Sequence, residues 1–187
     1  MFKTALLSTT LLVASTAFAG GLTPELKEKF SSQVKEIAQN PAVIAAVKSQ
    51  NTVHAGLSQD DILALDKKWR AEVTAANQPT VEKVLKNSTS DELRRVKNAR
   101  GGAITEIFVT DNKGLNVAAS DVTSDYYQGD EAKFTEVFNK TADTVHFGDV
   151  EEDESTQTFQ VQVSANVTEN GQKIGTVTVG LSADELG

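Results

Sequence analysis

The chain has 187 residues, a hydrophobic content of 39% and a formal net charge of -8. This length and composition are those of one globular domain with a sizeable core, and the negative charge argues against nucleic acid or an anionic membrane surface as a partner. The cysteine count of 0 excludes disulfides, thiolate catalysis and cysteine metal sites.

The N-terminus has the pattern of a secretory signal peptide. Lys3 precedes an apolar segment, and Ala17-Phe18-Ala19 matches an A-x-A cleavage site. A buried N-terminal helix is the alternative. We expect cleavage after Ala19, which removes residues 1–19 and leaves a periplasmic protein that begins at Gly20. No later segment has the roughly 18 to 20 continuous apolar residues that cross a bilayer, so we expect no direct insertion into a membrane.

Residues 20–100 carry the signals of helices. Thr23, followed by a proline, begins a first helix, and Asn40-Pro41 interrupts it because proline removes a backbone donor. The helix is expected to continue at an angle to Lys48. Residues 52–56 are then expected to form a connection.

His54 is expected to be solvated in that connection, since a lone loop histidine has no partner nearby in the sequence. The next helix is expected to begin at Ser58 and to end at about Ala75. A short helical turn over 80–86 and a further helical piece capped by Ser90 lead to the strands.

Residues 101–187 carry the signals of strands. Five segments contain alternating or β-prone apolar residues, the mark of half-buried strands: 106–110, 115–120, 145–147, 159–167 and 173–181. The turns Asp111 to Gly114 and Glu169 to Gly171 predict antiparallel hairpins, because Asn, Asp and Gly supply the positive φ angles that tight turns need. Helices followed by these strands predict an α+β domain with an antiparallel sheet.

Between the second and third predicted strands lies a polar loop followed by a helix start. The loop contains Asp125, two adjacent tyrosines, Tyr126 and Tyr127, and Asp130 at the beginning of the helix. A loop held by a hairpin on one side and by a helix on the other can form one wall of a pocket. Adjacent residues in extended backbone point in opposite directions, so we expect one of the two tyrosines to face that pocket.

Several stretches together resemble the Cache domains, extracellular PAS-like sensor modules of bacteria also called PDC sensors, in their single-module form. These stretches are Trp69-Arg70, Glu106 to Asn112, Gly114 to Val117, Ser120, Thr123 to Glu131, Lys133, Asp153 to Thr156 and Ile174-Gly175. The resemblance implies a five-stranded antiparallel PAS-like sheet with N-terminal helices on one face. It places a ligand pocket on the other face, roofed by residues 121–140.

The resemblance also implies a function. It predicts an exported sensor domain that recognises a small polar metabolite and that reports to a membrane-bound sensor kinase or chemoreceptor. An amino acid or a short carboxylate is the favoured ligand, and a small amine or a purine is the alternative. Most Cache domains are tethered by a transmembrane helix, whereas this sequence shows no such segment, so we expect a stand-alone periplasmic form. The alternative is a periplasmic interaction or dimerisation module without a ligand, in which long helices form a homodimer.

Nine residues are predicted to bind the ligand. They are Trp69, Arg70, Thr123, Asp125, Tyr126, Tyr127, Asp130, Asp153 and Ser155. In such a set arginine suits a carboxylate, aspartates suit an ammonium group, and aromatic rings supply shape. The alternative for the first two is that Trp69 belongs to the core and that Arg70 pairs with Asp66 or with solvent.

The sequence does not predict an enzyme. His54 and His146 are far apart, and neither lies in a nucleophile motif or in metal-ligand spacing. The acidic residues 149–154 lack the ligand and glycine positions of an EF-hand, so we expect a solvated loop there rather than a calcium site. No cofactor and no metal is expected.

The predicted cleavage is tested by mass spectrometry of the protein from a periplasmic extract. We expect an N-terminus at Gly20. Recovery of an intact Met1 terminus from the cytosol would contradict both the periplasmic localisation and the sensor hypothesis.

Overall fold

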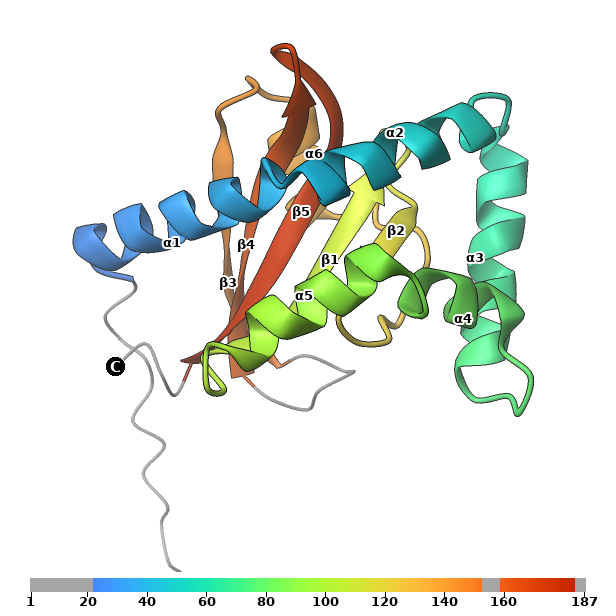
Figure 1. Ribbon diagram of the computed structural model, residues 1–187, viewed down its shortest axis with the longest axis horizontal. Helices are drawn as coiled ribbons and strands as arrows, with labels where there is room; N and C mark the ends of the chain where they lie inside the picture. Colours follow the sequence, from blue (N-terminus) through green and yellow to red (C-terminus); the bar gives the residue numbers. More distant parts are fainter. Residues whose placement is uncertain (1–21, 153–158, 184–187) are drawn as a thin grey trace, which may run out of the picture.

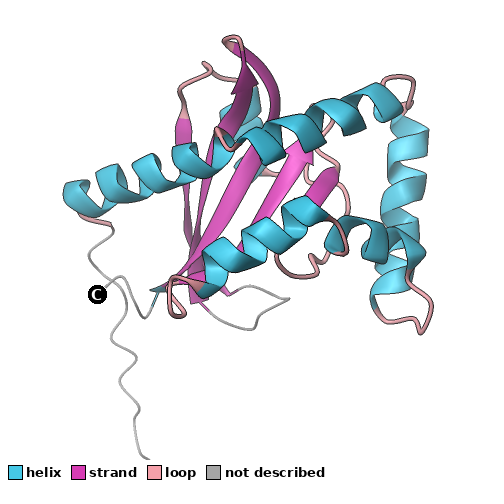
Figure 2. Cartoon of the chain, viewed as in Figure 1, coloured by secondary structure: helices cyan, strands magenta, loops and turns pink. Residues whose placement is uncertain are grey.

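The structure is a computed structural model that describes residues 22–152 and 159–183 (Figures 1 and 2). Five helices come first: α1 (Pro24–Ala38), α2 (Pro41–His54), α3 (Gln59–Val73), α4 (Pro79–Leu85) and α5 (Ser88–Asn98). They are followed by β1 (Ile104–Asp111), β2 (Asn116–Ala119), α6 (Ala132–Phe138), β3 (Val145–Glu152), β4 (Phe159–Glu169) and β5 (Gln172–Ser182). The predicted cleavage site and the predicted site residues Asp153 and Ser155 lie outside the described residues.

The strands form one antiparallel sheet in the order β2-β1-β5-β4-β3. Both predicted hairpins are present, since β1 pairs with β2 and β4 pairs with β5. The α+β class and the five-stranded antiparallel sheet are therefore confirmed. Strand β3 extends well beyond the predicted 145–147: the acidic residues up to Glu152 continue it along β4, so the expectation of a loop from Asp149 is wrong there.

Helices α1, α2 and α5 cover one face of the sheet, and α6 lies on the other (Figure 1). Side chains of alternate strand positions, such as Ile107, Val109, Val163 and Val177, form the main core with these three helices. The strands thus bury one continuous apolar face. The N-terminal helices are positioned by this face, as the resemblance predicts.

The helix starts follow local capping chemistry. The hydroxyl of Ser58 accepts from the backbone N–H of Asp61, whose carboxylate accepts from the N–H of Ser58 in return. The expected cap at Ser90 is wrong: α5 begins at Ser88, and the side chain of Asn87 accepts from the N–H of Ser90. Ser90 is buried instead, and its hydroxyl donates to the carbonyl of Val84.

His54 is not a solvated loop residue. Helix α2 extends through it, and its Nδ1 lies 2.7 Å from Oδ2 of Asp111, with the side chains only 8% and 0% exposed. The other oxygen of Asp111 accepts from the backbone N–H groups of Lys113 and Leu115. The connection is shorter than expected, since α2 ends at His54 and residues 55–58 lead to α3. The expectation of a solvated His54 fails because its partner is 57 residues away along the chain, where local sequence gives no sign of it.

The opposite face of the sheet is polar and still buried. The hydroxyls of Thr110 and Thr176 lie 2.7 Å apart, and those of Ser164 and Thr178 lie 2.9 Å apart, so each pair shares a hydrogen bond across neighbouring strands. All four side chains are buried. Burying a hydroxyl without a hydrogen-bond partner costs free energy. These cross-strand hydrogen bonds avoid that cost, so a polar face of the sheet can be buried.

Gly175 brings β5 against both β1 and α2. A Cβ atom there would lie well inside van der Waals distance of the Thr110 carbonyl oxygen and 2.9 Å from Cγ1 of Val47. We expect Gly175→Ala to lower the free energy of unfolding by about 1 to 3 kcal/mol, the usual cost of overpacking. Urea denaturation measures it. The control is Gly56→Ala, where the added Cβ meets nothing within 4 Å, and equal stability of the two variants would contradict this packing.

Candidate ligand-binding site

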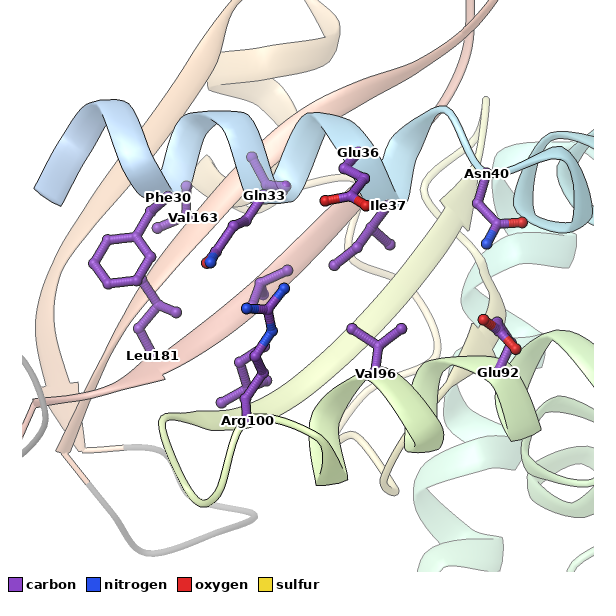
Figure 3. Close-up of a pocket in the computed structure, with 13 residues that line it drawn as sticks. Phe30, Gln33, Glu36, Ile37, Asn40, Glu92, Val96, Arg100, Val163 and Leu181 are labelled. Atoms are coloured by element: carbon purple, nitrogen blue, oxygen red, sulfur yellow. The ribbon is translucent and has the colours of Figure 1, made fainter.

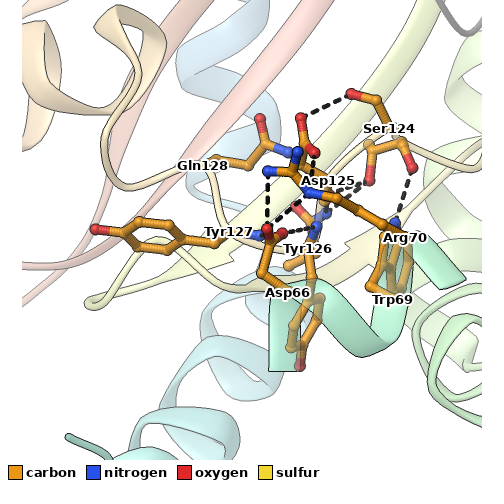
Figure 4. Close-up of polar contacts among 10 residues, drawn as sticks. Asp66, Trp69, Arg70, Ser124, Asp125, Tyr126, Tyr127 and Gln128 are labelled. Atoms are coloured by element: carbon orange, nitrogen blue, oxygen red, sulfur yellow. Dashed lines mark hydrogen bonds and ion pairs between the residues drawn. The ribbon is translucent and has the colours of Figure 1, made fainter. Parts of the chain in front are cut away.

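The carboxylate of Asp66 attaches the polar loop to helix α3 (Figure 4). Its Oδ1 accepts from the backbone N–H groups of Tyr126 and Tyr127 at 2.9 and 3.0 Å. Asp66 is 6% exposed, and a buried carboxylate needs such donors to offset its lost hydration. The loop is therefore held by a side chain that comes from 60 residues earlier in the chain.

Arg70 lies one turn further along α3 and joins the same network. Its Nε donates to Oδ2 of Asp66 at 2.8 Å, its Nη2 lies 2.8 Å from the same oxygen, and its Nε also lies 2.8 Å from Oδ1 of Asp125. The hydrogen bond with Asp66 raises the pKa of Arg70 above its ordinary value, so the guanidinium stays charged. The side chain is 61% exposed. The sequence leaves open whether Arg70 pairs with Asp66 or with solvent, and the structure contains the ion pair with Asp66.

Trp69 contacts the loop from the side of α3. It is 0% exposed, its indole N–H donates to the carbonyl of Thr123 at 2.8 Å, and its ring stacks on that of Tyr126 with centroids 5.3 Å apart. Burial, together with the negative charge of Asp111, raises the pKa of the Tyr126 hydroxyl, so this tyrosine stays neutral. Both rings belong to the second hydrophobic cluster of the protein.

The two tyrosines point in different directions (Figure 4), but neither is among the residues that line the cavity described below, so the expectation that one of them faces the pocket is not met there. Tyr126 turns toward Trp69, whereas the ring of Tyr127 lies over Gly129, where a Cβ would meet it. Gly129 in turn packs against Gly114 of the β1–β2 turn, and Gln128 donates its backbone N–H to the carbonyl of Gly114 at 2.7 Å. Glycine is needed at both positions because the backbones touch.

A cavity of about 310 Å³ lies between this loop, the beginning of α6 and the strands β3 and β4. Its lining residues are Ser124, Asp125, Glu131, Lys133, Gly148, Asp149, Glu151, Glu152, Gln160 and Gln162. It lies beneath the segment between β2 and β3, which the resemblance names as the roof of the pocket. Such a volume is at the lower end of small-molecule sites.

A buried carboxylate lies beneath the β4 side of the cavity. Glu106 is 3% exposed, and its Oε1 accepts from Nε2 of Gln160 and of Gln162 at 2.8 and 3.0 Å. Thr105 donates its hydroxyl to Oε1 of Gln160. Gly180 leaves room for Thr105, Glu106 and Gln160, because a Cβ atom at position 180 would collide with the side chains of all three residues.

The structure places the described site residues in different positions. Asp125 lines the cavity, whereas Trp69, Thr123 and Tyr126 hold the loop from the side of α3. Arg70 spans Asp66 and Asp125, Tyr127 is half-buried, and Asp130 is exposed at the end of the loop. Asp153 and Ser155 lie outside the described residues.

Sequence reasoning missed most of the cavity wall. Glu131 and Lys133 belong to the stretches that carry the resemblance but are not among the nine predicted site residues, and Asp149 and Glu151 fall in the predicted solvated loop. Gln160 and Gln162 occupy the polar positions of a strand that alternates regularly. One signal in the sequence could have identified this wall. It is the pair of glutamines on a strand face that a loop also covers.

A second hollow, of about 160 Å³, lies on the opposite face of the sheet between α1 and α5 (Figure 3). Its walls combine the apolar Phe30, Ile37, Val96 and Leu181 with polar and charged residues, namely Gln33, Glu36, Asn40, Glu92 and Arg100. Its volume is about half that of the cavity under the loop.

The role of Asp66 is tested by two substitutions with different chemistry. Asp66→Ala leaves two backbone N–H groups without an acceptor, so we expect it to lower the free energy of unfolding by about 1 to 3 kcal/mol. Asp66→Asn keeps an acceptor oxygen and loses only the charge that Arg70 contacts, so its effect should be smaller. Thermal unfolding followed by Trp69 fluorescence measures both. Asp60→Ala, at an exposed acid of the same helix, is the control, and a loss as large as that of Asp66→Ala would contradict the assignment.

No protein-family model matches the sequence, and no curated protein matches it. Solved structures do resemble the fold. The extracellular domain of a protein described as a histidine kinase, vpHK1S-Z8, matches with a TM-score of 0.52 and 9% identity over 87% of this chain and 53% of that chain.

Two further domains match with lower TM-scores. The ligand-binding domain of the Campylobacter jejuni chemoreceptor Tlp3, in complex with L-norvaline, gives 0.45 with 13% identity over 89% of this chain and 65% of that one. The sensor domain of the V. cholerae histidine kinase DctB gives 0.42 with 14% identity over 87% and 58%. The chain thus spans less than two thirds of each of these domains. The likeness shows a shared fold: the chain folds like the extracellular domain of vpHK1S-Z8.

Proposed function

We propose that this chain is an exported sensor domain that binds a small polar metabolite in the cavity between the loop, β3 and β4. The observation that carries the proposal is the position of this cavity. It lies on the sheet face opposite α1, α2 and α5, beneath the segment that joins β2 to β3, and its lining is largely polar. An amino acid or a short carboxylate is a ligand of the proposed kind.

Within this proposal the roles of the loop residues differ. Asp125 contacts the ligand directly, because it lines the cavity. Trp69, Thr123 and Tyr126 fix the position of Asp125 through the loop backbone, whose carbonyl at Asp125 accepts from Thr123 Oγ1 at 2.7 Å. Arg70 couples α3 to the same carboxylate.

Asp130, Tyr127, Asp153 and Ser155 complete the proposed ligand-binding set. Because Arg70 joins α3 to Asp125, a ligand bound at Asp125 would alter the contacts between the loop and α3. A membrane-bound sensor kinase or chemoreceptor could respond to such a change. The periplasm is the proposed location. In the part of the chain that the structure describes, no helix combines the length and the apolar character that crossing a membrane requires.

The proposal is tested by thermal unfolding with a panel of amino acids, carboxylates, amines and nucleobases at millimolar concentration. A ligand at about 100 times its dissociation constant adds roughly 2.7 kcal/mol, which raises the melting temperature of a domain of this size by roughly 5 to 10 °C. A panel without any effect, together with a dimer that forms with rising concentration, would contradict the proposal and favour the interaction module.

A further inference from the structure

We propose that a separate cavity beside α2 binds a short monocarboxylate. This cavity has a volume of about 350 Å³ and lies between α2, the junction of α4 with α5, and β2 (Figure 1). It shares no lining residue with the cavity under the loop, so the inference does not rest on the proposed function. Two features carry it: buried polar groups without partners, and a lining without negative charge.

Three buried side chains in the lining have polar atoms without a hydrogen bond. Thr89, Tyr126 and His54 are 5%, 5% and 7% exposed, and all three line the cavity. Among the described residues, no group is bonded to the hydroxyls of Thr89 and Tyr126 or to Nε2 of His54. Buried polar groups in folded proteins almost always have a partner. Three such groups in one cavity point to a bound molecule that supplies the partners.

The contact of His54 with Asp111 determines which ring nitrogen remains for a ligand. Nδ1 of His54 lies 2.7 Å from Oδ2 of Asp111. An ionised carboxylate only accepts hydrogen bonds, so Nδ1 donates and Nε2 remains, and a protonated ring donates from Nε2 as well. Asp111 also accepts from Nε2 of Gln50 at 3.2 Å and from two backbone N–H groups. Its negative charge is thus offset before a ligand binds.

The hydroxyl of Tyr126 is a neutral donor in a fixed position. Burial, together with the charge of Asp111, raises the pKa of this hydroxyl. The ring is held by its stacking on Trp69, and Figure 4 shows its hydroxyl pointing away from Asp125 and the loop backbone. A neutral hydroxyl with no other partner can donate to a carboxylate.

The lining carries no acidic side chain among the described residues, although the whole chain has a net charge of -8. Lys83 lines the cavity, and its ammonium group makes no ion pair within the described part of the chain. Helix α5 begins with Ser88 and Thr89, which both line the cavity, so the positive end of this helix lies there too. One ammonium group with neutral hydroxyls balances one negative charge, which favours a monocarboxylate over a phosphate.

Nuclear magnetic resonance of the isotope-labelled chain tests the inference with three probes: sodium propionate, propionamide and sodium phosphate. Propionamide has nearly the shape of propionate without its charge. We expect propionate to shift the backbone amides of His54, Ser88 and Thr89 and to leave those of Gly148 and Gln162 in place. The other two probes should bind more weakly.

Each other result of this titration contradicts the inference. Propionate shifts confined to Gly148 and Gln162 would overturn it and support the proposed function, because these residues line the cavity under the loop. The absence of any shift with propionate would show that the cavity beside α2 holds water alone, and it would leave the proposed function standing. Binding of propionamide or phosphate as tight as that of propionate would overturn the choice of a monocarboxylate.

The variant Tyr126→Phe separates ligand binding from a structural role. The hydroxyl has no partner in the chain without ligand, so we expect an unchanged melting temperature. Propionate should bind about 10-fold more weakly, since a hydrogen bond to a charged group is lost. A lower melting temperature with unchanged affinity would overturn the inference, because the hydroxyl would then serve the fold.

A pair of lysine variants tests the charge. Lys83→Gln should weaken propionate binding by about 3-fold, the usual size of an exposed charge contact. Lys67→Gln removes the same charge from an exposed position of α3 and should retain the affinity. Equal affinity of the two variants would contradict a role for Lys83 in this cavity.

Discussion

The hydrogen bonds that Gln160 and Gln162 donate to the buried carboxylate of Glu106 set the character of the sheet face beneath the cavity. Along β1, Ile107 and Val109 point into the apolar core, so Glu106 must point the other way. A carboxylate in that position is costly unless donors surround it. The two glutamines supply those donors through their Nε2 atoms. Their side-chain oxygens are therefore left to accept hydrogen bonds from other groups. One strand period thus produces an apolar face for the helices and an acceptor-rich face for a ligand.

The second element of the site is its roof, and Asp66 holds that roof. Helix α3 packs beside the edge of the sheet through Trp69, and Asp66 on the same helix accepts from the loop backbone. The ion pairs of Arg70 continue this contact to Asp125 at the cavity wall. Under the proposed function, a ligand that competes for Asp125 would act on helix α3 through Arg70. The contacts that shape the cavity would then carry the response.

Much of the fold could be predicted from the sequence, because strand alternation and turn chemistry are local signals. The hairpin turn at Gly114 and the start of α1 at Pro24 are examples, and both are present. The errors come from partners that lie far away in the chain. His54 was expected in solvent because Asp111 could not be recognised as its partner. The polar loop was recognised as one wall, but Gln160 and Gln162 looked like the solvent side of a strand. The structure shows that a loop covers this face of the sheet and that both glutamines line a cavity there.

Under the proposed function, the ligand lies between the loop, β3 and β4, and not between α1 and α5. Nuclear magnetic resonance measures this directly, through the backbone amide shifts of the isotope-labelled chain during titration with the panel compound that raises the melting temperature. Binding under the loop predicts the largest shifts at residues around the cavity, such as Gly148, Asp149 and Gln162. Largest shifts around the hollow between α1 and α5, at Phe30, Val96 and Leu181, would contradict it.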